Sequence, residues 1–383
     1  MGTTTSSNRP ADTAATDKRG WRPAGINVRN VPSLSKQFLA EAHAGYSFYT
    51  QDVDWDAVKQ MPLPRRIIFI VRAFFRSVLS KLSPARRLFL VAALVFYFLG
   101  RVQLFSNSSA KVEIDFQFFG FLILFTLLVL ELSDRVTMKR DLEIAREIQK
   151  WLVPGEAPAV PGGGIAFATR PQNSVAGDYY DAFYIRAGDQ NPEKLMLVIA
   201  DVAGKSVPAA LLMATFQASL RTLAGQGISL ERMIHLLNQY ASEHSMQGSR
   251  FTTAVLAEFD PTSNKFMYVN AGHNPLILRR ANGEIDFLSI GGIPLGIDVG
   301  SQYEIASVDL HSGDAVIFYT DGVIEALNQK GEELGEPRWR AAIIALPIGS
   351  AKDSLEFLMH GVDEFVGPTR QHDDITCLVF RLN

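Results

Sequence analysis

The sequence contains a single cysteine, Cys377, among its 383 residues. An intrachain disulfide is therefore excluded, and a reducing compartment suits the C-terminal part of the chain. This cysteine lies inside an apolar run with no phosphate-binding loop after it, which argues against a cysteine nucleophile. The formal net charge of −3 is close to neutral, so we expect no nucleic-acid partner.

Acidic residues are absent from Ala57 to Val112, while lysine and arginine accumulate there. Residues 65–82 place Arg or Lys at intervals of four to six among bulky apolar residues. That spacing is typical of a helix lying in a membrane interface, with its basic groups reaching the headgroups. Membrane lipid is therefore an expected partner of this segment.

Two apolar runs follow the basic segment, at residues 88–105 and 116–130. A membrane span needs about 20 residues, so both runs are short and need their polar flanks to reach the interface. We predict a hairpin of two spans joined by residues 106–113. Basic residues on both flanks then place both termini in the cytoplasm and the protein in the cytoplasmic (inner) membrane. The alternative is a buried helical hairpin of a soluble domain.

The remaining N-terminal sequence carries few signals. Its first 20 residues have no apolar core, which excludes a secretory signal peptide and indicates a disordered tail. We predict a disordered tail at 1–20, an unassigned region at 21–64, an interfacial helix and two transmembrane helices at 65–132, a helical linker at 133–155 and a folded domain at 160–383.

The linker segment at 133–152 is charged and ends before Pro154. Its residues Met138, Leu142, Ala145, Gln149 and Leu152 alternate by four and three, as in a heptad seam. This pattern fits a coiled coil in a homodimer, and it fits equally a helix packed on its own domain.

Beyond residue 161 the sequence is typical of strands and long helices. Because the strand-like runs have helices grouped between them, an α+β layered fold is indicated rather than βαβ alternation. The expected strands lie at 194–200, 251–259, 265–271, 275–280, 303–310, 314–320 and 375–381, and the expected helices at 207–225, 229–247 and 351–366.

Four aspartates end or follow strand-like runs in the sequence, namely Asp178, Asp201, Asp321 and Asp373. Any one of them alone would ordinarily be a turn former or helix cap. If they converge, their carboxylates repel one another unless cations neutralise them. Oxygen ligands without clustered His or Cys select Mg²⁺ or Mn²⁺, and two such ions can activate a bridging water to attack a phosphoryl group.

The aspartates lie in motifs that resemble the SpoIIE/RsbU-type branch of the metal-dependent PPM phosphatases (protein phosphatase type two C). The resemblance runs from about Leu142 to Phe380 and implies two antiparallel sheets between helical layers, an α-β-β-α sandwich. The motifs, in family order, are AGDYYD (176–181), DVAGKSVPAALLM (201–213), FTT (251–253), NAGHNP (270–275), LGI (295–297), GDAVIFYTDGVIEA (313–326) and DDIT (373–376).

By this resemblance two Mn²⁺ or Mg²⁺ ions are expected. The ligand set that it implies comprises Asp178, Asp201, the backbone carbonyl of Val202, Asp321 and Asp373, with Asp374 aligning less surely.

Other polar residues near these motifs are not expected to bind the metals. Asp181 and His273 read as structural residues, and Lys205 lacks the spacing of a Walker motif. The phosphate-gripping arginine of eukaryotic relatives has no clear counterpart, although Arg170 is the nearest candidate. Ser206 stands where the family pattern has glycine, as Ala176 does before Gly177; both are small enough to keep a close backbone approach.

The resemblance implies a protein serine/threonine phosphatase in a bacterial partner-switching pathway. Its expected partner is a phosphorylated STAS-domain anti-sigma-factor antagonist (anti-anti-sigma protein). Two alternatives stay open from the residues: an inactive membrane scaffold of the same fold, and a two-metal phosphodiesterase acting on nucleotides. The metal chemistry of the phosphodiesterase would be identical.

Overall fold

The computed structural model describes residues 82–105, 111–185, 193–244 and 250–383, together with isolated positions between 62 and 80. The predicted tail at 1–20, the unassigned region at 21–64 and most of the predicted interfacial helix at 65–82 lie outside the described residues. The chain divides into two compact units, residues 1–132 and 133–383.

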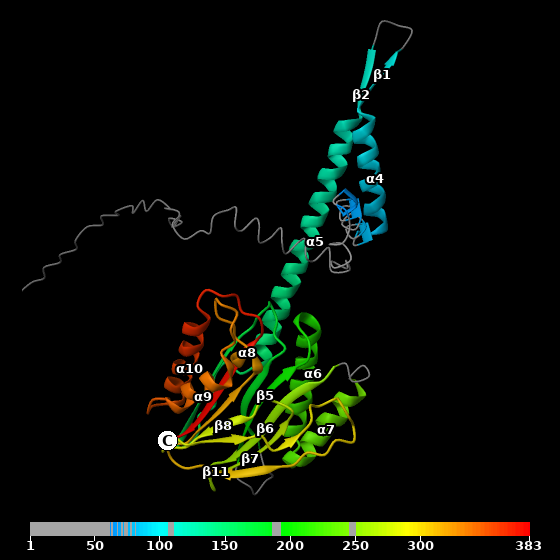
Figure 1. Ribbon diagram of the computed structural model, residues 1–383. Coiled ribbons are helices and arrows are strands. Elements are labelled where there is room, and N and C mark those ends of the chain that lie inside the picture. Colours follow the sequence, from blue (N-terminus) through cyan, green and yellow to red (C-terminus); the bar gives the residue numbers. More distant parts are fainter. Residues whose placement is uncertain are drawn as a thin grey trace, which may run out of the picture. The chain divides into compact units, whose positions relative to one another are not determined.

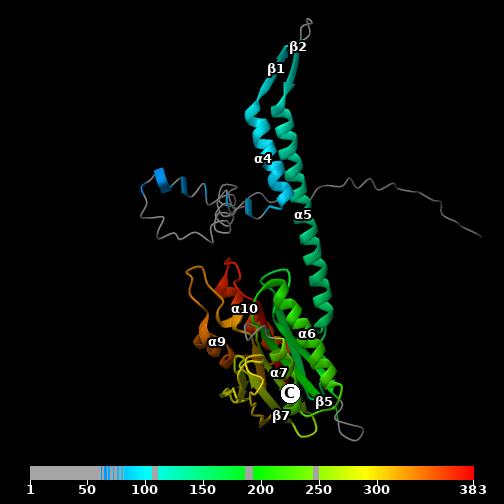
Figure 2. The ribbon, with the colours of Figure 1, turned by 90° about the vertical axis from the view of Figure 1, so that its right-hand side faces the viewer.

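The N-terminal unit contains a helical hairpin (Figures 1 and 2). Its elements are α4 (Pro84–Leu99), β1 (Arg101–Phe105), β2 (Lys111–Asp115) and the first part of α5 (Phe116–Leu152). The two strands pair antiparallel. A Cβ at Gly120 would lie 2.9 Å from the carbonyl oxygen of Ala93, so glycine permits the close contact of α4 with α5.

The first apolar run does not form the helix that we predicted to residue 105. Ser83 caps α4 by accepting from the backbone N–H of Arg86, and the helix ends at Leu99 because Gly100 adopts a φ of 66°. Residues 101–105 form β1 instead. The 16 residues of α4 span about 24 Å, short of the roughly 30 Å hydrocarbon core of a bilayer.

Within the described residues, α5 is the one helix whose length and composition would let it cross a membrane. It includes the second predicted span, and many of its large apolar side chains there are exposed, as is that of Phe121. The helix continues without a break into the charged segment that we predicted as a separate linker.

The C-terminal unit is a sandwich of two mainly antiparallel sheets with helices on both outer faces (Figures 1 and 2). One sheet has the strand order β10-β7-β6-β5-β4, with β11 also on β7, and the other has the order β3-β13-β12-β8-β9. Its elements are β3 (Gly163–Arg170), β4 (Tyr179–Ile185), β5 (Lys194–Val202), α6 (Ser206–Ala224), α7 (Leu230–Glu243), β6 (Thr252–Asp260), β7 (Lys265–Ala271), β8 (Leu276–Arg279), β9 (Ile285–Leu288), β10 (Gly291–Gly292), β11 (Ala306–Asp309), β12 (Ala315–Tyr319), α8 (Asp321–Ile324), α9 (Gly335–Ile344), α10 (Ala351–Val366) and β13 (Ile375–Leu382).

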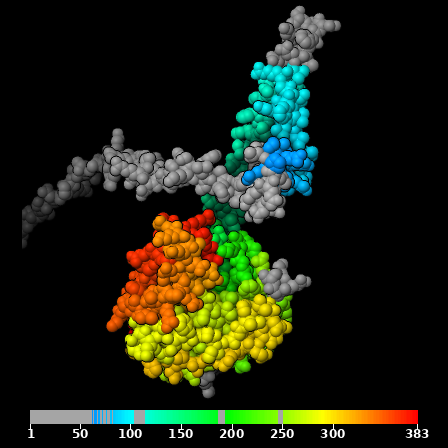
Figure 3. Space-filling view, in the orientation of Figure 1, coloured from blue at the N-terminus to red at the C-terminus, as the bar shows by residue number. Residues whose placement is uncertain are grey.

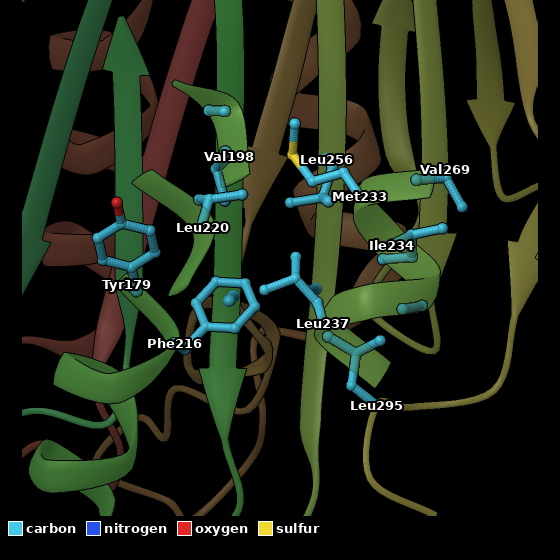
Figure 4. Packing of buried hydrophobic residues seen from close by; sticks show 14 of the residues in the cluster. Tyr179, Val198, Phe216, Leu220, Met233, Ile234, Leu237, Leu256, Val269 and Leu295 are labelled. Carbon is cyan, nitrogen blue, oxygen red and sulfur yellow. The ribbon is translucent and has the colours of Figure 1, made fainter. Parts of the chain in front are cut away.

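Three apolar layers hold this sandwich together. In the first, α6 and α7 pack on the sheet of β5 and β6 through residues such as Phe216 and Leu237 (Figure 4). Between the sheets, the rings of Phe259 and Phe380 lie with centroids 4.9 Å apart. In the third, Trp339 of α9 packs against the second sheet. The α-β-β-α sandwich that we expected is therefore confirmed.

Local sequence explains the elements that we predicted well. Strand β5 is buried on both faces, which is why its sequence is a continuous apolar run. Helix α7 begins where the Ser229 side chain accepts from the N–H of Arg232. Helix α10 begins with a capping box of Ser350 and Asp353.

In the space-filling view of Figure 3, the orange and red atoms that include α9 and α10 lie to one side of the yellow ones.

Six elements of the C-terminal unit were not predicted: β3, β4, β9, β10, α8 and α9. Strand β3 contains three glycine or alanine residues in its first four and is half-buried throughout, so it lacks both a bulky run and a clean alternation. The predicted end of α7 at 247 lies outside the described residues, which show the helix to Glu243.

Candidate metal centre and active site

Five aspartates lie at corresponding ends of neighbouring strands. Asp201 is the next-to-last residue of β5 and Asp321 follows β12, as predicted. Asp178 and the pair Asp373 and Asp374 instead directly precede strands, β4 and β13, so the expectation that all of them end or follow strands was wrong.

Antiparallel pairing explains why the cluster forms nevertheless. The first residue of β4, Tyr179, pairs with Ala200 near the end of β5, and Cys377 near the start of β13 pairs with Tyr319 at the end of β12. The start of one strand thus lies beside the end of its neighbour. Each sheet contributes carboxylates to one edge of the sandwich.

The carboxylates raise one another's pKa values. Burial, with the charge of Asp201 next, raises the pKa of Asp178 well above its ordinary value. Burial and the charges of Asp321, Asp373 and Asp374 raise the pKa of Asp201 to about 7. Burial and the charge of Asp373 also raise the pKa of Asp321. Desolvation and like charges disfavour ionisation together, so a nearby cation would relieve the cluster.

Asp374 has its two oxygens occupied by backbone donors. Oδ1 accepts from the N–H of Gln172 and Oδ2 from the N–H of Gly177, each at 2.7 Å. This carboxylate therefore ties the segment before Asp178 to the start of β13. Burial raises its pKa, and these backbone bonds oppose the rise.

Lys205 lies against the cluster from the loop between β5 and α6. Its ammonium donates to Oδ2 of Asp373 at 2.8 Å and to the carbonyl of His372 at 3.0 Å. The hydrogen bond to Asp373 raises the pKa of this lysine. Lys205 is not part of a Walker motif. It lies beside the aspartates because its ammonium donates to Asp373 and to the carbonyl of His372.

Two buried threonines connect the sheets beneath the carboxylates. The hydroxyl of Thr320 donates to Oδ2 of Asp178 at 2.9 Å and accepts from the N–H of Thr376 at 3.0 Å. Both threonines have no exposed surface. Thr320 directly precedes Asp321, and Thr376 follows Asp374 by two residues. The sequence did not predict a role for either threonine, because threonine is common in strands.

Two glycines allow the backbones to approach at this edge. A Cβ at Gly177 would lie 3.2 Å from the carbonyl oxygen of Val202, the predicted backbone ligand. A Cβ at Gly322 would lie only 2.0 Å from the carbonyl oxygen of Asp374. Larger residues at either position would push the carboxylates apart.

His273 contacts Thr253 in this structure. Its Nδ1 lies 2.8 Å from the Thr253 hydroxyl, which donates in turn to the backbone carbonyl of Asp201 at 3.3 Å. Burial lowers the pKa of His273 to about 4, so the ring is neutral.

Asp181 and Arg170 are held in ion pairs. The fully buried carboxylate of Asp181 receives two 2.7 Å hydrogen bonds from Arg221 of α6 and a third bond from Tyr179. Arg170 forms a bidentate pair with Asp363 of α10. The first pair joins α6 to β4. The second occupies the guanidinium of Arg170, the nearest candidate for phosphate binding in the sequence.

A cavity of about 310 Å³ borders the cluster at Asp373 and Lys205. Its lining carries both positive and negative side chains. The charged residues at its wall include Arg170, Lys205, Glu325, Asp363, Arg370 and Asp373.

The donor set fits hard divalent cations. In the part of the chain that the structure describes, no three His, Cys, Asp or Glu side chains are already arranged around one ion. The chemistry is nevertheless that of an Mg²⁺ or Mn²⁺ site, because the neighbouring groups are buried, mutually repelling carboxylates. Binding would require these side chains to turn toward a shared ion.

Comparison with known proteins agrees with this geometry. The family described as Stage II sporulation protein E (SpoIIE) matches residues 191–383. The phosphoserine phosphatase RsbU of Bacillus subtilis is 27% identical over 245 residues, which cover 64% of this chain and 70% of RsbU. Protein IcfG of Synechocystis sp. is 27% identical over 284 residues, 67% of this chain but 44% of IcfG. This chain therefore spans less than half of IcfG.

A solved structure agrees in fold. The SiaA-PP2C domain of Pseudomonas aeruginosa superposes with a TM-score of 0.55 at 21% identity, over 66% of this chain and 99% of that domain. The sandwich and its edge of carboxylates define a PP2C-type (PPM) phosphatase domain. The chain belongs to the SpoIIE family, and the resemblance drawn from its motifs is confirmed.

Proposed function

We propose that this chain is a metal-dependent protein phosphatase that hydrolyses phosphoserine or phosphothreonine. The observation that carries the proposal is the convergence of five aspartates from two sheets at one edge, beside a cavity. The similarity to a relative named phosphoserine phosphatase supports the choice of reaction.

The ions would be held by Asp178, Asp201, the carbonyl of Val202, Asp321 and Asp373. When bound, two divalent ions supply an activated water and neutralise the phosphoryl oxygens. The chain's own contribution is to keep the carboxylates close despite their repulsion. Thr320 and Asp374 do so by hydrogen bonds to Asp178 and to the segment before it.

Lys205 is the basic residue that we propose meets the substrate phosphate. Its ammonium lines the cavity and already lies 2.8 Å from Asp373, whereas Arg170 is held by Asp363. An ammonium next to the metal ligands would attract the phosphate and lower the repulsion between it and the carboxylates.

The substrate that we propose is a phosphorylated STAS-domain anti-sigma-factor antagonist in a partner-switching pathway. Support for it comes from the family resemblance. The test incubates the purified full chain, in detergent, with such a phosphoprotein and separately with a cyclic dinucleotide, both with Mn²⁺. Phosphate release from the protein alone supports the proposal. Cleavage of the nucleotide alone would identify a phosphodiesterase, and no turnover of either would favour an inactive scaffold.

We also propose that the N-terminal unit anchors the enzyme in the cytoplasmic membrane. The apolar first part of α5 and the exposed apolar side chains of α4, such as Phe98, support this placement. Arg86 and Glu131 form an ion pair near the open end of the hairpin, where both can reach the headgroups. The domain organisation proposed is then anchor, helix and catalytic domain.

A further inference from the structure

The end of α5 is joined to the backbone of the active-site edge by one side chain. The amide nitrogen of Gln149 donates to the carbonyl of Ala176 at 2.7 Å, and its amide oxygen accepts from the N–H of Ala176 at 2.9 Å. One amide therefore satisfies both backbone groups of a buried residue. Such a pair fixes position and orientation together, because both bonds must be aligned.

Ala176 lies two residues before Asp178, and the segment between them has little freedom. Asp374 receives the N–H of Gly177 at 2.7 Å, and Gly177 packs closely against Val202 and Ala209. The segment is thus held by Asp374 on the side of the second sheet and by Gln149 on the side of α5. A displacement of Ala176 would be passed directly to Asp178.

An open hollow borders part of the contact between the end of α5 and this segment. The hollow, of about 160 Å³, is lined by Arg146, Gln149 and Val153 on one side and by Asp178, Tyr180 and Met213 on the other. Val153, directly after α5, packs against the first apolar layer, and the two hydrogen bonds of Gln149 add a direct contact with Ala176 itself.

We propose that Gln149 is a positioning residue that sets the place of Asp178 through the backbone of Ala176. The inference rests on the proposed function, in which Asp178 holds a divalent ion. Groups that orient metal ligands from behind commonly change metal affinity or activity by about ten- to a hundredfold when removed.

The experiment compares the full chain in detergent with Gln149→Ala, Gln149→Glu and the control Glu147→Ala, whose side chain is exposed on the same helix. Mn²⁺ binding is measured from the electron paramagnetic resonance signal of free Mn²⁺, and KM and kcat are measured with the phosphoprotein. We expect Gln149→Ala to weaken Mn²⁺ binding by about tenfold or more, with KM for the phosphoprotein unchanged. Glu147→Ala should match the wild type.

Gln149→Glu adds a readout that a merely structural role would not move. An ionised glutamate accepts from the N–H of Ala176 but repels its carbonyl, whereas a protonated one can donate to it. The deficit in Mn²⁺ binding relative to wild type should therefore shrink as the pH is lowered. Wild-type Mn²⁺ affinity in Gln149→Ala, with a melting temperature lowered equally with and without Mn²⁺, would overturn the proposal. Because binding is read independently of turnover, a wild-type chain that binds Mn²⁺ without hydrolysing the phosphoprotein would fail the proposed function and still test Gln149.

Discussion

The hydroxyl of Thr320, at the end of β12 in one sheet, donates a 2.9 Å hydrogen bond to Oδ2 of Asp178, at the start of β4 in the other. This contact joins residues 142 positions apart and crosses the sandwich at the carboxylate edge. The same hydroxyl accepts a hydrogen bond from the N–H of Thr376. It therefore links the ends of three strands, β12, β4 and β13. The distance between the two halves of the proposed metal centre therefore depends on this buried side chain as well as on Asp374, which accepts from the N–H of Gly177.

Thr320→Val should lower both stability and activity. The substitution keeps the shape but leaves the N–H of Thr376 unpaired and removes a donor from Asp178, which costs about 1–3 kcal/mol for a buried group. Urea unfolding in chelator and phosphatase rate in Mn²⁺ measure the two effects. Thr222→Val removes only an exposed hydroxyl bond to Ala218 and serves as the control. Equal stability of the two variants would contradict the role of Thr320.

Ser206→Gly should stabilise the protein. Ser206 stands where the family pattern has glycine, and it adopts a φ of 64°, in the left-handed region that costs a non-glycine residue about 1–2 kcal/mol. After the greater flexibility of glycine in the unfolded chain is subtracted, we expect a gain of about 0.5–1 kcal/mol.

The matched control for this change is Ser219→Gly within α6, which should destabilise by about as much because its backbone is helical. Thermal or urea unfolding of both variants gives the comparison. A loss of stability in Ser206→Gly would show that the serine is retained for a contact that outweighs its strain.

The metal-free protein should lose stability as pH rises through the range in which Asp201 ionises. The folded pKa of Asp201 is about 7, above the ordinary 3.8 of the unfolded chain, so the folded state binds the proton more tightly. Its favourable contribution is complete below pH 3.8 and is lost as pH rises to about 7. His273 acts oppositely: its folded pKa of about 4 makes stability rise between pH 4 and its ordinary 6.5.

The two trends are separated by comparison with Asp201→Asn, which cannot ionise. In chelator, this variant should gain stability relative to wild type as pH rises from 4 to 7, and saturating Mn²⁺ should reverse the order at pH 7. Unfolding free energies at a series of pH values test the prediction. A difference between the variants that stays constant with pH would refute the raised pKa.

The membrane topology can be tested with reporter fusions. Basic residues flank both ends of the hairpin, so a reporter fused after residue 109 should behave as external and one fused at residue 383 as internal. If the segment at 65–82 also spans the membrane, a fusion at residue 20 becomes external. Full recovery of the chain in the soluble fraction would contradict the anchor.

Sequence patterns predicted the long buried strands, the capped helices and the residue types of the metal centre. Strand β5 and helix α7 carry strong local signals, namely a continuous apolar run and a serine cap. Strand β4 was not predicted, because the sequence pattern places Asp178 at the end of a strand and the structure places it at the start of one. Since the pairing is antiparallel, the start of β4 lies beside the end of β5, and both readings place Asp178 near Asp201.

Contacts between distant side chains could not be predicted in this way. The pairing of Arg170 with Asp363, 193 positions away, depends on how α10 lies over β3. The same is true of Lys205 with Asp373 and of Gln149 with Ala176. No local sequence pattern specifies such contacts, because Arg, Lys, Asp and Gln are all common on exposed protein surfaces. Register and helix placement across the whole sandwich decide them.

The central claim is that converging carboxylates form a metal centre that hydrolyses phosphoprotein, and Asp321→Asn tests it most directly. Asparagine keeps the shape but loses the charge that balances a divalent ion, and it relieves repulsion with Asp373 in the metal-free state. The measurement is the Mn²⁺-dependent release of phosphate, paired with melting temperature in chelator. Asp309→Asn, at an exposed position on β11, is the control. We predict loss of turnover with an unchanged or higher melting temperature; a near wild-type rate, or a collapsed melting temperature in chelator, would contradict the account.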